Sequence, residues 1–219
     1  MHGQDRTRLE LPGGRVGVVA IVRLRAHEPD DKLLDALVDG GVQAVEVTLP
    51  TPGALDAVRR WSGDGRVTVG VGTVRTPKDA VAAAEAGAAF LVTPTTRTAV
   101  LEAAAERRIP VVCGALTPTE IDVAWARGAA AVKVFPVATV GGPAYVRAVR
   151  EPLDDVLLLP TGGVDVASTE EFARAGCVGV GIGGGLVAEQ LVADRDWSTL
   201  SRRASRFVAA WRTGLDGRG

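Results

Sequence analysis

Short, almost wholly apolar runs alternate along this chain with longer segments in which alanine and leucine recur at helical spacing. Four of the apolar runs are Val18–Arg23, Val67–Gly72, Ile109–Gly114 and Val156–Pro160. Amphipathic patterns typical of helices cover the intervening segments Asp30–Asp39, Thr51–Trp61, Pro77–Ala86 and Thr98–Arg107. Continuous apolar runs of this length are typical of strands buried on both faces, so the pattern predicts a parallel sheet covered by helices.

A repeated pattern predicts four further strands. Each repeat contains the end of an alanine-rich helix, a glycine and then an apolar run. The glycines are 46, 41 and 48 residues apart, at Gly41, Gly87, Gly128 and Gly176. Glycine commonly ends helices in this way because it adopts a left-handed conformation without strain. The spacing is about two strand–helix units, so these strands alternate with the other four.

Eight strand–helix units predict an α/β protein, a single-domain (β/α)8 TIM barrel over residues 17–213. Residues 1–16 are expected to be irregular, and Trp197–Trp211 is expected to form a closing amphipathic helix. An open doubly wound sheet is the competing architecture, but no Gly-x-Gly-x-x-Gly sequence follows the first predicted strand.

Composition narrows the classes of function. The 219 residues are 47% hydrophobic with a formal net charge of −1, and no basic block favours a nucleic-acid partner. Cys113 and Cys177 are expected to be buried small residues in a reducing compartment, and His2 and His27 predict no metal cluster. The first apolar run, Val16–Val22, is too short for a signal peptide or a membrane span. We therefore expect a cytoplasmic protein.

Lys133 is the most unusual residue in the pattern. Lysine occurs three times among 25 basic residues, and Lys32 and Lys78 lie in ordinary charged helical segments. Lys133 lies instead within the apolar run 129–136. Burial penalises an unpaired ammonium and favours the neutral amine, which is the nucleophile that forms Schiff bases with carbonyl substrates. The alternative is a lysine that extends to solvent or pairs with a structural carboxylate.

The alternation of side chains along each strand predicts where the ionisable groups lie. Lys133 lies on the opposite face of its strand from its two valine neighbours, and so does Glu46. If the valines pack beneath helices, both ionisable groups point into the barrel. Active sites of this fold lie at the carboxyl ends of the strands, where Glu46, Thr73, Thr93 and Lys133 all fall.

Paired glycines follow the last two predicted strands. They are Gly162 with Gly163 and Gly183 with Gly184. Backbone amides at these two strand ends commonly bind phosphate in this fold, because glycine allows an anion to approach closely. The alternative is that the glycines serve only as turns and helix caps.

Six segments, in this order and within residues 17 to 190, resemble the 2-keto-3-deoxy-6-phosphogluconate (KDPG) aldolase / 4-hydroxy-2-oxoglutarate (KHG) aldolase family. They are Val18–Arg23, Val45–Leu49, Gly70–Val74, Val92–Pro94, Val132–Pro136 and Pro160–Val164. The resemblance implies that Lys133 is the Schiff-base lysine and that Glu46 is the general acid/base. The implied substrate-binding residues are Arg23, Thr73, Pro94, Phe135, Thr161, Gly162, Gly163, Gly183 and Gly184.

The resemblance also implies a homotrimer that needs no metal or other cofactor and acts on a small-molecule 2-keto acid. The expected reaction cleaves KDPG to pyruvate and glyceraldehyde 3-phosphate, with 4-hydroxy-2-oxoglutarate as a further substrate. Two residues depart from the family pattern. Where this chain has Pro50, many members have an arginine that binds the substrate carboxylate. Where it has Gly184, many members have a serine that binds phosphate. Two alternatives remain open: a phosphate-binding isomerase or decarboxylase, and a catalytically impaired oligomeric scaffold.

Overall fold

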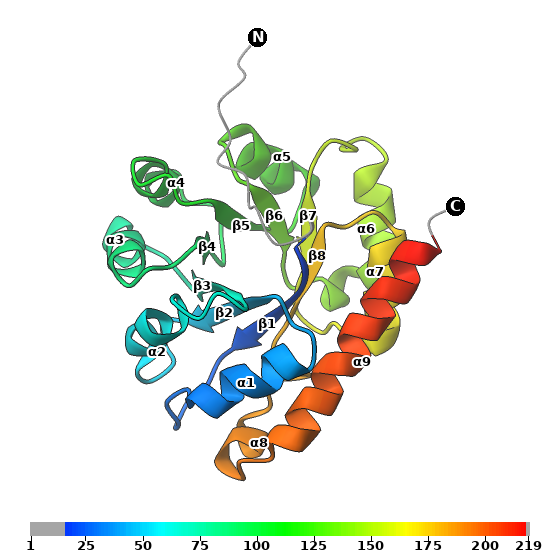
Figure 1. Cartoon of the computed structure of the whole chain (residues 1–219). Helices are drawn as coiled ribbons and strands as arrows, with labels where there is room; N and C mark the ends of the chain where they lie inside the picture. Colours follow the sequence, from blue (N-terminus) through cyan, green and yellow to red (C-terminus); the bar gives the residue numbers. More distant parts are fainter. Residues whose placement is uncertain (1–15, 218–219) are drawn as a thin grey trace.

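Eight parallel strands lie at the centre of the molecule and helices surround them (Figure 1). The computed structural model describes residues 16–217. Its strands are β1 (Gly17–Val22), β2 (Ala44–Thr48), β3 (Thr68–Gly72), β4 (Phe90–Val92), β5 (Val111–Ala115), β6 (Ala131–Val134), β7 (Leu158–Pro160) and β8 (Gly179–Ile182). From β1 to β7 each strand pairs in parallel with the next, and β8 pairs with β1. One bridge, between Thr161 and Gly181, links β7 to β8, so the predicted (β/α)8 barrel is confirmed.

Helices cover the outside of this barrel. They are α1 (Asp31–Asp39), α2 (Ala54–Trp61), α3 (Pro77–Glu85), α4 (Thr98–Ala105), α5 (Pro118–Ala126), η1 (Ala138–Val140), α6 (Gly142–Arg150), α7 (Val166–Arg174), α8 (Glu189–Ala193) and α9 (Trp197–Asp216). The helix α8 has only five residues. The 20-residue α9 packs against α7 and α1, and thereby covers the side of the barrel next to β8 and β1 (Figure 1).

The closing helix is longer than expected. It was predicted to end at Trp211, with the barrel ending at residue 213, but α9 continues to Asp216. Gly214 lies where α9 approaches α7, because a Cβ atom there would lie 2.3 Å from the carbonyl oxygen of Glu170. Gly214 therefore permits close packing of two helices and does not end the helix. The irregular segment expected over residues 1–16 lies outside the described residues, apart from Val16, which is buried.

Several strand ends also differ from the expectation by one or two residues. The strand β5 begins at Val111, two residues later than predicted, because Pro110 has no amide hydrogen to join the ladder. The strand β7 begins at Leu158, also two residues late. The strand β1 ends at Val22, so Arg23 lies just beyond its carboxyl end.

The four repeated glycines end helices as the sequence predicts. Their φ angles are +86°, +87°, +89° and +87° at Gly41, Gly87, Gly128 and Gly176. At α5, the amide of Gly128 bonds the carbonyl of Trp125 (3.0 Å), and the next amide bonds the carbonyl of Ala124 (3.2 Å). The other three helix ends repeat this pair of hydrogen bonds. Each repeat thus turns the chain directly from a helix into the next strand.

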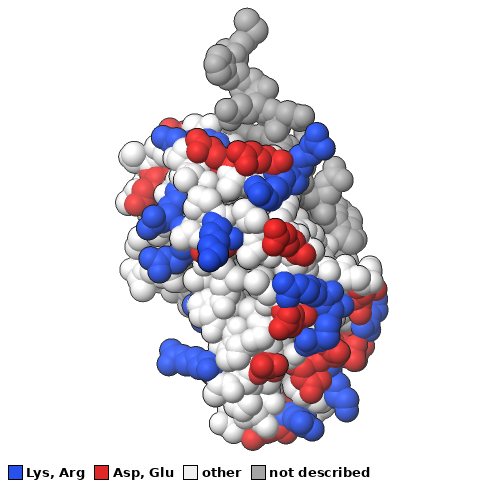
Figure 2. Space-filling model, turned by 90° about the vertical axis from the view of Figure 1, so that its left-hand side faces the viewer, with Lys and Arg blue, Asp and Glu red and all other residues white. Residues whose placement is uncertain are grey.

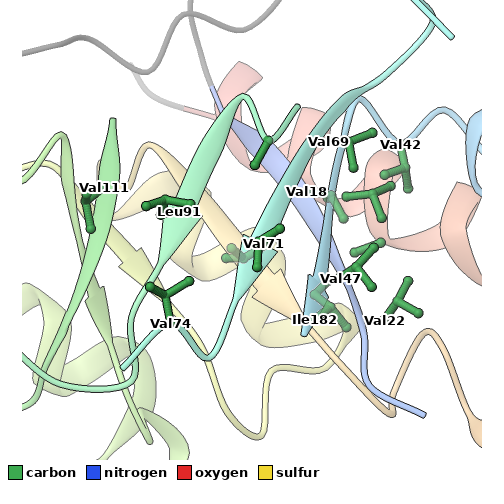
Figure 3. Close-up of a cluster of buried hydrophobic side chains, with 14 of the residues drawn as sticks. Val18, Val22, Val42, Val47, Val69, Val71, Val74, Leu91, Val111 and Ile182 are labelled. Atoms are coloured by element: carbon green, nitrogen blue, oxygen red, sulfur yellow. The ribbon is translucent and has the colours of Figure 1, made fainter. Parts of the chain in front are cut away.

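Side chains of the strands divide into two packed layers. Valines on the outer face, among them Val18, Val47 and Val71, form the cluster beneath the helices (Figure 3). A second cluster fills the barrel interior with Val16, Val19, Ala44, Phe90, Val92, Val112, Ala131 and Leu159. Glu46 and Lys133 follow Ala44 and Ala131 by two residues, so both side chains face the interior near the carboxyl ends of their strands. The predicted parity is confirmed.

Charged residues of both signs cover the surface. On the face in Figure 2, lysine and arginine side chains are interspersed with aspartate and glutamate. Within residues 16–217, no helix is both long and apolar enough to cross a membrane.

Candidate active site

A cavity of about 720 Å³ opens at the carboxyl ends of the strands. Lys133 lines it, together with all nine residues expected to bind substrate: Arg23, Thr73, Pro94, Phe135, Thr161, Gly162, Gly163, Gly183 and Gly184. These residues come from the ends of six strands that are distant in the sequence. The fold therefore gathers the predicted residues around one space large enough for a small metabolite. Their individual roles in binding remain predictions.

Lys133 lines this cavity and forms a buried ion pair with Glu46, which is not itself a lining residue. The Nζ atom of Lys133 lies 3.8 Å from Oε1 of Glu46, and the side chains are only 7% and 2% exposed. This Oε1 atom is buried and accepts no hydrogen bond from residues 16–217. An unsatisfied buried acceptor is costly, and it is commonly retained where it serves chemistry. The pair therefore provides an amine and a free proton acceptor beside the same cavity.

Phe135 forms the wall next to the amine. The Nζ atom of Lys133 lies 5.5 Å from the centre of its ring, within the range of a cation–π contact. The ring is 41% exposed, so it borders the open part of the cavity. An aromatic ring in this position limits the access of water to the amine from the side that the ring covers.

The two glycine pairs have different steric requirements. Gly162 and Gly163 have φ angles of +91° and +77°. A Cβ atom at Gly163 would lie 2.4 Å from the Cβ of Ala138, so this turn requires glycine. At Gly183 and Gly184, a Cβ atom would meet nothing within 4 Å. This second pair therefore lies beside open space, and a small side chain can be added there.

The amides of these four glycines are free donors. None of them donates a hydrogen bond to an acceptor within the described part of the chain. All four glycines line the same cavity, two of them in the loop after β7 and two in the loop after β8. Clustered free amides are a typical site for a phosphate or a carboxylate.

Arg23 supplies a positive charge at the cavity wall. Its Nη2 atom donates to Oγ1 of Thr73 at 3.1 Å. Thr73 has a φ angle of +61°, which is rare for a β-branched residue and marks a strained conformation at a functional site. Pro50 is exposed and does not line the cavity. Thr93, although it lies at the same end of the barrel, is buried behind the wall, where its hydroxyl accepts from the amide of Gly114.

Sequence reasoning missed two charged residues of the cavity, Arg25 and Glu189. The carboxylate of Glu189 accepts from the amides of Arg25 (2.9 Å) and Ala26 (2.7 Å). These hydrogen bonds hold the pKa of Glu189 below its usual value. No local pattern signals the contact, because the partners are more than 160 residues apart. Arg25 had a signal: it follows Arg23 by two residues at the end of the same strand.

A family model and curated relatives are similar to the chain. The family model "KDPG and KHG aldolase" matches residues 14–203. The 2-dehydro-3-deoxy-phosphogluconate aldolase of Pseudomonas aeruginosa is 36% identical over 206 residues, which are 92% of this chain and 93% of the relative. The 2-dehydro-3-deoxy-6-phosphogalactonate aldolase of Escherichia coli is 32% identical over 198 residues, 88% of this chain and 94% of the relative.

A solved structure adds a chemical comparison. It is KDPG aldolase from Legionella pneumophila with pyruvate captured at low pH as a covalent carbinolamine intermediate. It is 27% identical and superposes with a TM-score of 0.78, over 87% of this chain and 94% of the other.

Proposed function

Because this chain belongs to the KDPG and KHG aldolase family and is a class I aldolase, we propose that it cleaves a 2-keto-3-deoxy sugar acid to pyruvate and an aldehyde. The proposed substrate is KDPG, with glyceraldehyde 3-phosphate as the aldehyde and 4-hydroxy-2-oxoglutarate as a further substrate. The observation that carries the proposal is the buried amine of Lys133, which lies 3.8 Å from a carboxylate oxygen of Glu46 that accepts no hydrogen bond from the described residues.

In the proposed mechanism, Lys133 is the nucleophile. Its neutral amine attacks the C2 carbonyl, and loss of water leaves a protonated imine. Glu46 removes the proton of the C4 hydroxyl, and the C3–C4 bond breaks. The bonding pair moves toward the imine and forms an enamine, while the aldehyde leaves. Glu46 then returns the proton to C3, and water hydrolyses the imine to release pyruvate and the free amine.

The arginine side chain and the backbone amides of the cavity support separate binding sites for the carboxylate end and the phosphate end of the substrate. The keto acid carboxylate is proposed to bind near Arg23 and Thr73, since an arginine is missing at Pro50. The phosphate is proposed to bind the free amides after β7 and β8. Relatives named for the gluconate and the galactonate forms are similarly close to this chain, so turnover of both C4 epimers under the same conditions identifies the preferred one.

We predict that the phosphorylated acid is the better substrate and that Gly184→Ser increases this preference. A serine fits because the site is open, and its hydroxyl can add one hydrogen bond to phosphate. Such a bond contributes about 0.5–1.5 kcal/mol, or roughly 2- to 10-fold in kcat/KM. Steady-state kinetics with phosphorylated and unphosphorylated 2-keto-3-deoxygluconate measures the ratio.

Gly184→Ala is the matched control, because it adds the Cβ atom without the hydroxyl and should leave the ratio unchanged. If the wild type prefers the unphosphorylated acid and Gly184→Ser changes nothing, the phosphate site is assigned wrongly.

Family membership favours the aldolase over the two alternatives, an isomerase or decarboxylase and a non-catalytic scaffold. Retro-aldol turnover of any 2-keto-3-deoxy acid excludes the scaffold. Two further expectations from the resemblance, the homotrimer and the cytoplasmic location, stay predictions.

A further inference from the structure

Glu46 lies across a position of the neighbouring strand where a side chain is missing. A Cβ atom built on Gly72 of β3 would lie 1.8 Å from Oε1, 2.4 Å from Cδ and 2.6 Å from Cγ of Glu46. Non-bonded carbon atoms pack at about 3.5–4.0 Å, so the two groups cannot coexist. The carboxylate occupies the volume that the first side-chain atom of any other residue would fill.

The backbone at Gly72 does not itself require glycine. Gly72 is not among the residues with a positive φ angle. It is the last residue of β3, in register with Thr48 of β2, and its carbonyl accepts from the amide of Leu49 at 2.9 Å. Gly72 is therefore hydrogen-bonded to β2, the strand that carries Glu46. The backbone cannot move away without breaking that pairing.

We infer that Gly72 is a positioning residue, whose missing side chain sets the carboxylate of Glu46 against the amine of Lys133. Hydrogen bonds do not fix this orientation, because Oε1 of Glu46 accepts none from the described residues. The shape of the site fixes it instead, because the absence of a side chain at Gly72 leaves the space that the carboxylate occupies, 3.8 Å from Nζ. The kinetic consequence rests on the proposed role of Glu46, whereas the steric coupling does not.

Gly72→Ala should therefore impair proton transfer and spare imine formation. The methyl group displaces the carboxylate, so we expect turnover to fall by roughly 10²-fold or more, approaching the loss of a general base. Exchange of the pyruvate methyl protons with deuterated water, followed by NMR, reports protonation of the enamine directly and should slow in parallel. Borohydride trapping of pyruvate on Lys133 should persist.

Gly70→Ala is the matched control on the same strand. A Cβ atom at Gly70 would meet the ring of Phe90 at 2.5 Å, so this variant disturbs the barrel interior at a different side chain. It should lower the melting temperature while the exchange rate per folded molecule stays close to that of the wild type. If both variants lost exchange equally, Gly72 would contribute only to the packing of the barrel, and the inference would be wrong.

A double-mutant cycle in stability tests the coupling without any substrate. Gly72→Ala should lower the melting temperature of the wild type and have little effect in the Glu46→Ala background, where the clashing atoms are gone. If the Gly72→Ala single variant does not fold but the Gly72→Ala/Glu46→Ala double variant does, the result supports the inference equally. An equal cost in both backgrounds, or failure to fold in both, contradicts the inference. A preserved coupling in a protein that shows no exchange would contradict the proposed function instead.

Discussion

Replacing Lys133 by arginine is expected to abolish retro-aldol turnover, although the positive charge is retained. Guanidinium remains protonated under all ordinary conditions and cannot attack a carbonyl to form an imine. Loss of a covalent nucleophile should lower kcat by roughly 10⁴-fold or more. The measurement is pyruvate release from KDPG by the purified Lys133→Arg variant, with its folding checked by circular dichroism.

The two other lysines provide the control for this prediction. Lys32 and Lys78 are exposed on or beside helices away from the cavity, so their arginine variants should retain the activity of the wild type. An active Lys133→Arg variant would mean that the residue acts as a fixed charge and would favour the isomerase or decarboxylase alternative.

The second large effect is expected from Glu46→Gln. Glutamine has nearly the same shape, so it fits over Gly72, but its amide cannot accept and return a proton as a carboxylate does. Turnover should fall by roughly 10²–10⁴-fold, the usual contribution of a general acid/base. Imine formation uses the amine of Lys133 and should survive, which a borohydride-trapping time course with pyruvate can show.

The comparison of these two steps separates the roles of the residues. If Glu46→Gln loses imine formation together with turnover, Glu46 is required for the attack by the amine of Lys133, and its role is not the removal of the C4 hydroxyl proton. If turnover is unchanged, another group moves the proton.

The architecture and the position of the Lys133–Glu46 pair could be predicted from the sequence because both depend on short-range periodicity. Alternation along a strand places Glu46 opposite its valine neighbours, and the helix-ending glycines separate the repeats. The same strand-end reasoning predicted cavity residues such as Gly162. These signals are local, and a barrel repeats the same local geometry around its axis.

What the sequence could not predict depends on contacts between distant segments. The contact of Glu189 with the amide of Arg25 joins the first residue of α8 to the loop after β1. The space that Gly72 leaves for Glu46 depends on which way one side chain rotates between neighbouring strands. Gly214 resembles a helix terminator in the sequence, and only the packing of α9 on α7 gives it another role.

We propose that Lys133 forms a covalent imine with the keto acid. The most direct test is incubation of the protein with pyruvate and borohydride, followed by peptide mass spectrometry, because only an imine is reduced onto the lysine. We expect one reduced pyruvyl group per chain, on the peptide that contains Lys133. Labelling of Lys32 or Lys78 in its place, or no labelling at all, would contradict it.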